Sequence, residues 1–100
     1  MKKIVLCCNA GMSTSMLVEK IRAAAAAEGF DCQVVAHPIS EVKEKAGDAD
    51  VILLGPQVRY ELKKVQKLFP DKPVEPIAPT DYGMLKGDSV LKRAKELMGV

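Results

Sequence analysis

The sequence is poor in aromatic residues and in histidine, and it has no strong excess of charge of one sign. Among its 100 residues there is no Trp, one His and only two each of Tyr and Phe, so the core must be aliphatic. The 15 basic residues nearly balance the 13 acidic ones, which argues against a dedicated nucleic-acid binder. A chain of this length buries somewhat over ~60% of its unfolded surface. We therefore expect one domain that spans residues 1–100.

Cysteine is scarce as well, and long apolar runs are absent. Three cysteines without a Cys-x-x-Cys pair, together with a single histidine, argue against a disulfide framework and against a structural zinc site. No apolar run approaches the ~20 residues that a bilayer span needs, and the apolar start passes into a small-residue loop too early for a signal peptide. We expect a cytoplasmic protein with reduced thiols, no metal and no segment inserted in the membrane.

Apolar runs that alternate with amphipathic stretches predict an α/β fold. Ile4–Cys7 and Val51–Leu54 are apolar throughout, which is typical of strands buried on both faces of a parallel sheet. Asp31–His37 predicts an outer strand, and Val74–Ile77 predicts an edge strand because Pro76 has no amide hydrogen for a ladder. This order of elements favours a parallel sheet with helices on both faces.

Helices are predicted in the connections between these strands. They cover Met16–Glu28, a short segment capped by Ser40 and ended by Gly47, a helix opened by Gly55-Pro56 and closed by Pro70, and a last helix introduced by Gly87-Asp88. In parallel sheets of this kind, ligands bind beyond the carboxyl ends of the strands. The loops after Cys8, Leu54 and Ile77 are therefore expected to meet at a site.

The loop after the first strand has the composition of an anion-binding turn. It reads Cys8-Asn9-Ala10-Gly11-Met12-Ser13-Thr14-Ser15, and most of these side chains are small enough for the backbone to approach a ligand. Successive amide N–H groups of such a turn point inward, and the helix that follows adds roughly half a positive charge at its start. The loop can therefore hold a phosphate, and the same field favours the thiolate form of Cys8, a nucleophile by location.

A plainer interpretation of these residues stays open. A cysteine at a strand end is often a small buried hydrophobe, and small polar turns before helices often serve only as caps. Cys7 lies on the strand itself, on the opposite face from its neighbours, and is expected to pack in the core. Cys32 is expected to do the same at the start of an outer strand.

The run from Cys8 to Ser15, together with Leu53-Leu54-Gly55-Pro56-Gln57 and Lys72-Pro73-Val74-Glu75, resembles the IIB component of the bacterial phosphoenolpyruvate-dependent sugar phosphotransferase system. The resemblance is to the lactose/cellobiose and chitobiose class, and it covers the whole chain. It implies a four-stranded parallel sheet of order 2-1-3-4, like that of low-molecular-weight tyrosine phosphatases. It also implies a phosphocysteine at Cys8, cradled by Asn9, Ala10, Gly11, Met12, Ser13, Thr14 and Ser15.

The same resemblance implies a relay between proteins, without a cofactor. A phosphohistidine of the IIA component donates its phosphoryl group to Cys8, which passes it to a sugar held by the membrane-embedded IIC permease. Fixed N–H donors suit the negative charge of a phosphoryl group in transfer. The pair Cys7-Cys8 departs from the family, which usually has an apolar residue without a thiol before the nucleophile, and this leaves open which sulfur reacts.

Two other functions compete with the relay. Low-molecular-weight tyrosine phosphatases carry an Arg six positions after their loop cysteine; here that position is Thr14, and Arg22 lies ~12 Å further up the helix at ~1.5 Å per residue. Without this clamp, transfer is favoured over hydrolysis. Asp81, in a loop expected to face Cys8, is either the general acid of such a phosphatase or an ordinary turn residue. The third candidate is a non-catalytic phosphate-binding regulatory module in which Cys8 is incidental.

Other residues have open roles around the expected site. Gln57 either reaches the phosphate or caps the helix that starts there. Tyr82 could rim the site, and Met12 and Met16 could offer adaptable apolar contact to IIA and IIC in turn. A basic cluster is either a solvated helix face or a docking patch; it consists of Arg59, Lys63, Lys64 and Lys67.

Overall fold

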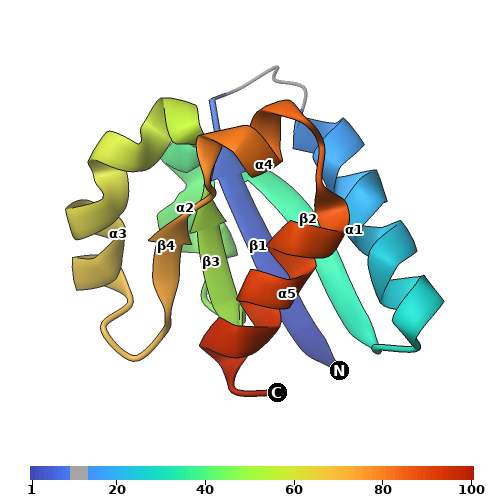
Figure 1. Ribbon diagram of the computed structural model, residues 1–100. Coiled ribbons are helices and arrows are strands. Elements are labelled where there is room, and N and C mark those ends of the chain that lie inside the picture. Colours follow the sequence, from blue (N-terminus) through green and yellow to red (C-terminus); the bar gives the residue numbers. More distant parts are fainter. Residues whose placement is uncertain (10–13) are drawn as a thin grey trace.

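Four parallel strands form one sheet in the order β2-β1-β3-β4 (Figure 1). A computed structural model describes residues 1–9 and 14–100. Its strands are β1 (Lys2–Cys8), β2 (Cys32–Pro38), β3 (Val51–Leu54) and β4 (Val74–Pro76). The predicted α/β class and the 2-1-3-4 order are confirmed, and β4 lies at an edge as its proline required.

Helices connect the strands and cover both faces of the sheet (Figure 1). They are α1 (Thr14–Glu28), the 3-10 helix η1 (Ile39–Glu41), α2 (Val42–Lys45), the 3-10 helix η2 (Pro56–Glu61), α3 (Leu62–Leu68), α4 (Pro79–Gly83) and α5 (Gly87–Met98). The predicted helix after the first strand begins two residues earlier than expected, and α5 begins at Gly87 as predicted.

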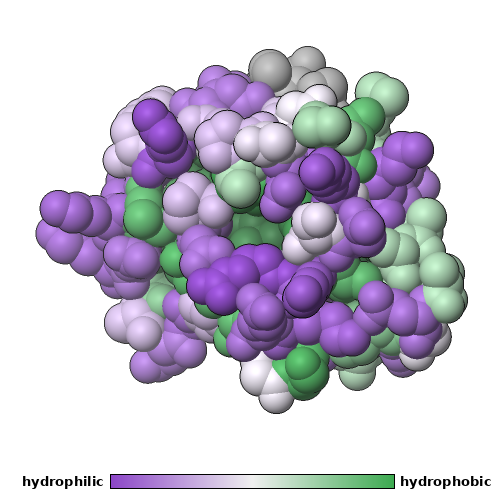
Figure 2. All heavy atoms as spheres, viewed as in Figure 1, coloured by the Kyte–Doolittle hydropathy of each residue, from purple (hydrophilic) through white to green (hydrophobic). Residues whose placement is uncertain are grey.

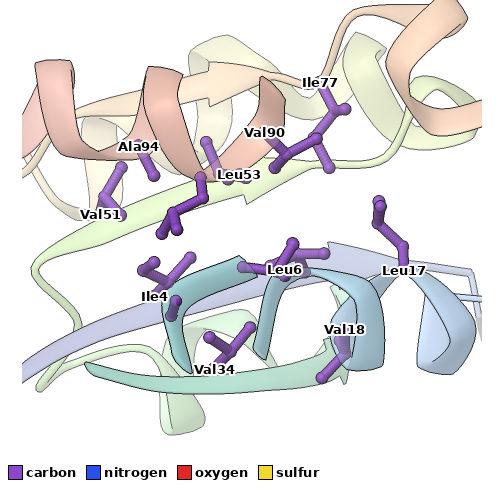
Figure 3. Packing of buried hydrophobic residues seen from close by; sticks show 13 residues of the cluster. Ile4, Leu6, Leu17, Val18, Val34, Val51, Leu53, Ile77, Val90 and Ala94 are labelled. Carbon is purple, nitrogen blue, oxygen red and sulfur yellow. The ribbon is translucent and has the colours of Figure 1, made fainter. Parts of the chain in front are cut away.

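Two apolar clusters hold the helices to the sheet, one on each face. β1 supplies both clusters because its side chains alternate: Ile4 and Leu6 face α1 and α5, whereas Val5 and Cys7 face α2 and α3. Figure 3 shows the first cluster, in which side chains of α1 and α5 meet those of β1 and β3. The second cluster also contains Val42, Ile52, Leu54, Val58 and Val65.

Three local predictions were wrong, and in each a short helix is involved. Ser40 lies inside η1 and makes no capping hydrogen bond; Pro38 precedes that helix instead. The region after Gly55, predicted as a single helix, begins with the 3-10 helix η2, whose backbone leaves helical geometry at Val58 (φ −119°, ψ 18°), and the α-helix α3 starts only at Leu62. The loop expected around Asp81 is instead the helix α4. Helices this short carry too little periodicity to be recognised from the pattern of apolar residues.

An ion pair between Glu75 of the edge strand β4 and Arg93 of α5 contributes to the stability of the fold, and this contribution can be measured. The Arg93 guanidinium donates from Nε and Nη2 to the two carboxylate oxygens of Glu75, at 2.7 Å each. The hydrogen bonds from Arg93 hold the pKa of Glu75 below the usual 4.5 of a glutamate side chain. Because the folded state has the lower pKa, this stabilisation is present at neutral pH and is lost as the pH falls through the folded pKa.

We therefore expect Glu75→Gln to lower the free energy of unfolding slightly at neutral pH, as is usual for an ion pair that solvent partly screens. The difference from the unmodified chain should shrink as the pH falls below 4.5. Urea unfolding of both proteins at a series of pH values measures this difference in the free energy of unfolding. A difference that stays constant or grows on acidification would show that the ion pair does not stabilise the fold.

Candidate functional site

The carboxyl ends of the central strands meet at one edge of the sheet, where Cys8 is the last residue of β1. Backbone hydrogen bonds continue the pairing past the strands: Gly55 N donates to Cys7 O at 2.8 Å, and Ile77 N donates to Leu54 O at 2.7 Å. Figure 1 shows α4 lying across this edge. The ends of these strands therefore lie together at one edge, as parallel strand order requires, and the loops after Cys8, Leu54 and Ile77 leave the sheet there.

Cys8 is placed differently from the cysteine before it. The Cys8 residue keeps 7% of its surface exposed and is a member of neither apolar cluster. Cys7 has no exposed surface and packs in the cluster beneath α2 and α3, as predicted. Burial raises the pKa of the Cys7 thiol from 9.0 to about 12, and the neighbouring Cys8 adds to that rise. Cys7 is therefore a neutral thiol at physiological pH.

The third cysteine is a structural residue of the outer strand. Cys32 begins β2 and packs, partly buried, against the first apolar cluster. Burial raises the pKa of its thiol, and the nearby carboxylates of Asp31 and Glu28 act in the same direction. The expected packing role of Cys32 is confirmed.

The predicted cradle is described only at its two ends. Asn9 is exposed after the end of β1, while Thr14 is the first residue of α1 and is 2% exposed. Ser15 follows as an exposed residue of the first turn. The other four predicted cradle residues lie outside the described residues; they are Ala10, Gly11, Met12 and Ser13.

Three predicted residues from three elements join in one hydrogen-bonded chain at this edge. Tyr82 of α4 lies in the middle: its Oη is 3.0 Å from Thr14 Oγ1 and accepts from Gln57 Nε2 at 3.1 Å. Thr14 comes from the start of α1, and Gln57 comes from η2. Thr14 and Tyr82 are 68 positions apart in the sequence, so no local pattern could reveal this set of hydrogen bonds. Gln57 makes no capping hydrogen bond, and the capping role considered for it is wrong.

Gly55 lets the side chain of Gln57 lie beside Cys8. A Cβ atom on Gly55 would fall 2.6 Å from Gln57 Oε1 and 3.6 Å from Cys8 Cβ, which leaves no room for any other residue with Gln57 in this position. The φ of −60° is open to all residues, so the glycine matters here only for the space that it leaves to the Gln57 side chain. The oxygen of Gln57 and the Cβ of Cys8 thus both lie close to Gly55.

Asp81 takes no part in the hydrogen bonds among Thr14, Tyr82 and Gln57. It lies in α4 and lines a cavity of about 310 Å³ between the sheet edge and α5, beside Ile77, Val90 and Arg93. Neither Cys8 nor Thr14 is among the described residues that line it. Figure 2 shows this hollow with an apolar base and hydrophilic residues around it. The predicted loop position of Asp81 is wrong because Pro79 starts a helix there.

Exposed apolar side chains lie on the same elements that supply Thr14, Gln57 and Tyr82. Met16 in the first turn of α1, Tyr60 in η2 and Met84 at the end of α4 are 55%, 75% and 64% exposed. The sequence drew attention only to Met16. The basic cluster is exposed along η2 and α3, and its members are Arg59, Lys63, Lys64 and Lys67.

Known proteins with the same arrangement identify the family. The profile described as "PTS system, Lactose/Cellobiose specific IIB subunit" matches residues 3–93. The chain belongs to this family. It is thus a IIB component of a sugar phosphotransferase system, as the loop after the first strand suggested.

Relatives of this IIB chain match it along almost its entire length. It is 42% identical over 104 residues to the galactose-specific EIIB component of Lactococcus lactis subsp. cremoris, covering 97% of this chain and 96% of that one. The cellobiose-specific EIIB component of Lactococcus lactis subsp. lactis gives the same identity and coverage, 42%, 97% and 96%. The oligo-beta-mannoside-specific EIIB component of Bacillus subtilis is 37% identical, covering 98% and 97%.

Solved IIB structures share the fold. The lactose-specific IIB domain of Streptococcus pneumoniae superimposes with a TM-score of 0.85 at 17% identity and 96% coverage of both chains, which supports the fold alone. The cellobiose-specific IIB component of Borrelia burgdorferi has a TM-score of 0.81 at 35% identity, covering 98% of this chain and 92% of that one.

The described residues hold neither a metal-ligand cluster nor a membrane-spanning helix. Among residues 1–9 and 14–100, no three His, Cys, Asp or Glu side chains gather as a metal ion needs. Within the same ranges, no helix has both the length and the apolar character of a bilayer span.

Proposed function

We propose that this chain carries a phosphoryl group on Cys8 between two partners of a sugar uptake system, and that residues 1–100 are one phosphotransfer domain. The phosphohistidine of the IIA component is the donor, and a sugar bound by the IIC permease is the acceptor. The position of Cys8 carries the proposal: it ends the central strand at the ligand-binding edge, outside both apolar clusters and just before the start of α1.

Each transfer exchanges one bond to phosphorus for another. In the first, Cys8 Sγ attacks phosphorus, the S–P bond forms and the N–P bond of the phosphohistidine breaks, while the thiol proton goes to the leaving imidazole. In the second, a sugar hydroxyl oxygen attacks, the O–P bond forms and the S–P bond breaks. The hydroxyl proton passes to a base on the permease, and Cys8 leaves as thiolate.

The loop from Asn9 to Ser15 supplies the electrostatic part of the mechanism in this scheme. Its amide N–H groups and the start of the 15-residue helix α1 are suited to the charge on the equatorial oxygens of a phosphoryl group. The partner supplies the in-line position of donor and acceptor.

The burial of Cys7 supports Cys8 as the reacting sulfur. A thiol with a pKa of about 12 and no exposed surface is a poor nucleophile and is out of reach of a partner protein. The second thiol of the Cys7-Cys8 pair then has a packing role, equivalent to the apolar residue usual in the family.

The two partners would use the same face in turn, on the cytoplasmic side of the membrane. Met16, Tyr60 and Met84 offer exposed apolar contact around the loop, and the basic cluster lies beside them on η2 and α3. A surface shared by two partners suits a modest, transient interface. The sugar contacts belong to IIC in this scheme, because Cys8 carries only the phosphoryl group.

The contacts of Arg22 and Asp81 weigh against a phosphatase. Arg22 donates from Nη2 to Val34 O at 2.7 Å and from Nη1 to Glu19 Oε1 at 2.7 Å, so its guanidinium is engaged away from the loop. Asp81 lines the cavity beside α5. A phosphatase of this fold would need both a phosphate clamp and a general acid beside the cysteine.

We therefore expect hydrolysis of p-nitrophenyl phosphate to stay at the level of Cys8→Ser, which lacks the thiol. The release of p-nitrophenolate, followed by absorbance, measures this rate. Steady turnover at the ordinary ~1–10³ s⁻¹ of enzymes, lost in Cys8→Ser, would contradict the relay and support the phosphatase.

A further inference from the structure

One buried polar atom beside Cys8 has no partner among the described residues. It is Gln57 Oε1, which is shielded from solvent and makes no hydrogen bond there. The nitrogen of the same carboxamide is satisfied by Tyr82. A buried unpaired oxygen is unfavourable unless a ligand or a second state uses it.

The unpaired oxygen of Gln57 lies close to the side chain of Cys8. Gln57 Oε1 and Cys8 Cβ both lie within 4 Å of one point above Gly55. The side chain of Cys8 continues the alternation of Ile4 and Leu6, so it points to the face on which Tyr82 packs. A thiol suits an acceptor at this place because its S–H is a weak donor. A phosphoryl group does not, because its oxygens are all acceptors and carry negative charge.

We propose that the carboxamide of Gln57 turns over when Cys8 is phosphorylated, so that its nitrogen replaces its oxygen and donates a hydrogen bond to the phosphoryl group. This inference rests on the proposed function. The oxygen and the NH₂ group of a glutamine occupy nearly the same space, and the last torsion of the side chain is soft. This rotation of the carboxamide therefore requires no repacking around Gly55.

Tyr82 allows the Gln57 carboxamide to rotate without the loss of a hydrogen bond. With nitrogen toward Tyr82, the Tyr82 hydroxyl accepts from Gln57 and has its own hydrogen for Thr14 Oγ1. With oxygen toward Tyr82, the hydroxyl donates to Gln57 and accepts from the Thr14 hydroxyl. Both hydrogen bonds of Tyr82, to Gln57 and to Thr14, are therefore kept, and in each the donor and the acceptor exchange roles. Gln57 thus presents a hydrogen-bond donor to Cys8 when Cys8 is phosphorylated, and an acceptor when Cys8 is a free thiol.

The test measures how far the phosphoryl group moves from the phosphorylated IIA donor to this chain at equilibrium. Gln57→Glu keeps the shape but has only acceptor oxygens at neutral pH, so it should lower the equilibrium constant about tenfold or more. Tyr82→Phe, which removes the hydroxyl that orients the carboxamide, should give a smaller loss. Gln66→Glu makes the same change at an exposed position of α3 and should match the unmodified chain.

A second measurement follows the carboxamide itself. In ¹⁵N-labelled protein, the side-chain NH₂ signals of Gln57 should shift downfield and exchange more slowly with water when Cys8 is loaded, while those of Gln66 should not change. Equal loading of Gln57→Glu and Gln66→Glu, or unchanged Gln57 signals in the loaded protein, would overturn the inference and leave the relay standing. Failure of the unmodified chain to accept any phosphoryl group would overturn both.

Discussion

Cys8→Ser is expected to take up phosphoryl groups from a phosphorylated IIA donor at least about a thousandfold more slowly than the unmodified chain. A serine hydroxyl is a far weaker nucleophile toward phosphorus than a cysteine sulfur, because oxygen holds its proton more tightly and is less polarisable. Serine keeps the size of the side chain nearly unchanged. Intact-mass spectrometry over time, reading one added phosphoryl group, measures the rate.

Cys7→Ala is the matched control because it removes the adjacent sulfur and leaves Cys8 in place. It deletes a fully buried atom, so circular dichroism should first establish that the variant is folded. Its rate of phosphoryl uptake is expected to stay close to that of the unmodified chain. If Cys8→Ser is labelled normally while Cys7→Ala is not, the assignment of the two sulfurs is reversed. A chain that binds phosphate but is never labelled would instead support the binding module.

Gly87→Ala is expected to destabilise the fold by about 3 kcal/mol, a large part of the stability of a domain of this size. Gly87 is buried where α5 begins to pack on α1. A Cβ there would lie 2.5 Å from Lys20 O and 2.6 Å from Ile21 N, and it would also overlap Lys20 C. These are backbone atoms of α1 and cannot move aside singly, so the two helices would have to separate. Urea unfolding gives the free energy.

Gly47→Ala is the control for this substitution, because Gly47 is exposed and a Cβ there would meet nothing within 4 Å. Its effect should stay within about 0.5 kcal/mol of zero. If Gly87→Ala is as stable as Gly47→Ala, α1 and α5 do not approach one another as closely as described.

The sheet was predictable from the sequence because its signals are local. Ile4–Cys7 and Val51–Leu54 have no polar side chain, which fits only strands that are covered on both faces. Pro76 predicted an edge for β4 in the same way. Short helices were less predictable: α4 has only five residues and too little apolar periodicity, and no Gly or Pro marks the backbone break at Val58.

For Cys8, Thr14, Gln57 and Tyr82, the sequence predicted a common edge of the sheet but not the hydrogen bonds made there. The loop after the first strand indicated Cys8, and the resemblance to IIB components indicated its neighbours. The bond between Thr14 and Tyr82 depends on α4 lying across the sheet edge, and the unpaired oxygen of Gln57 depends on the space left by Gly55. Neither follows from spacing in the sequence, because each involves elements brought together by tertiary packing.

The location of the phosphoryl group in the unmodified chain is the most direct test of the central claim. After incubation with a phosphorylated IIA donor, the protein should carry one phosphoryl group, and peptide fragmentation under mild conditions should place it on Cys8. Addition of the IIC permease with its sugar should then remove it. A phosphoryl group found on Cys7 or on His37, the single histidine of the chain, would contradict the account.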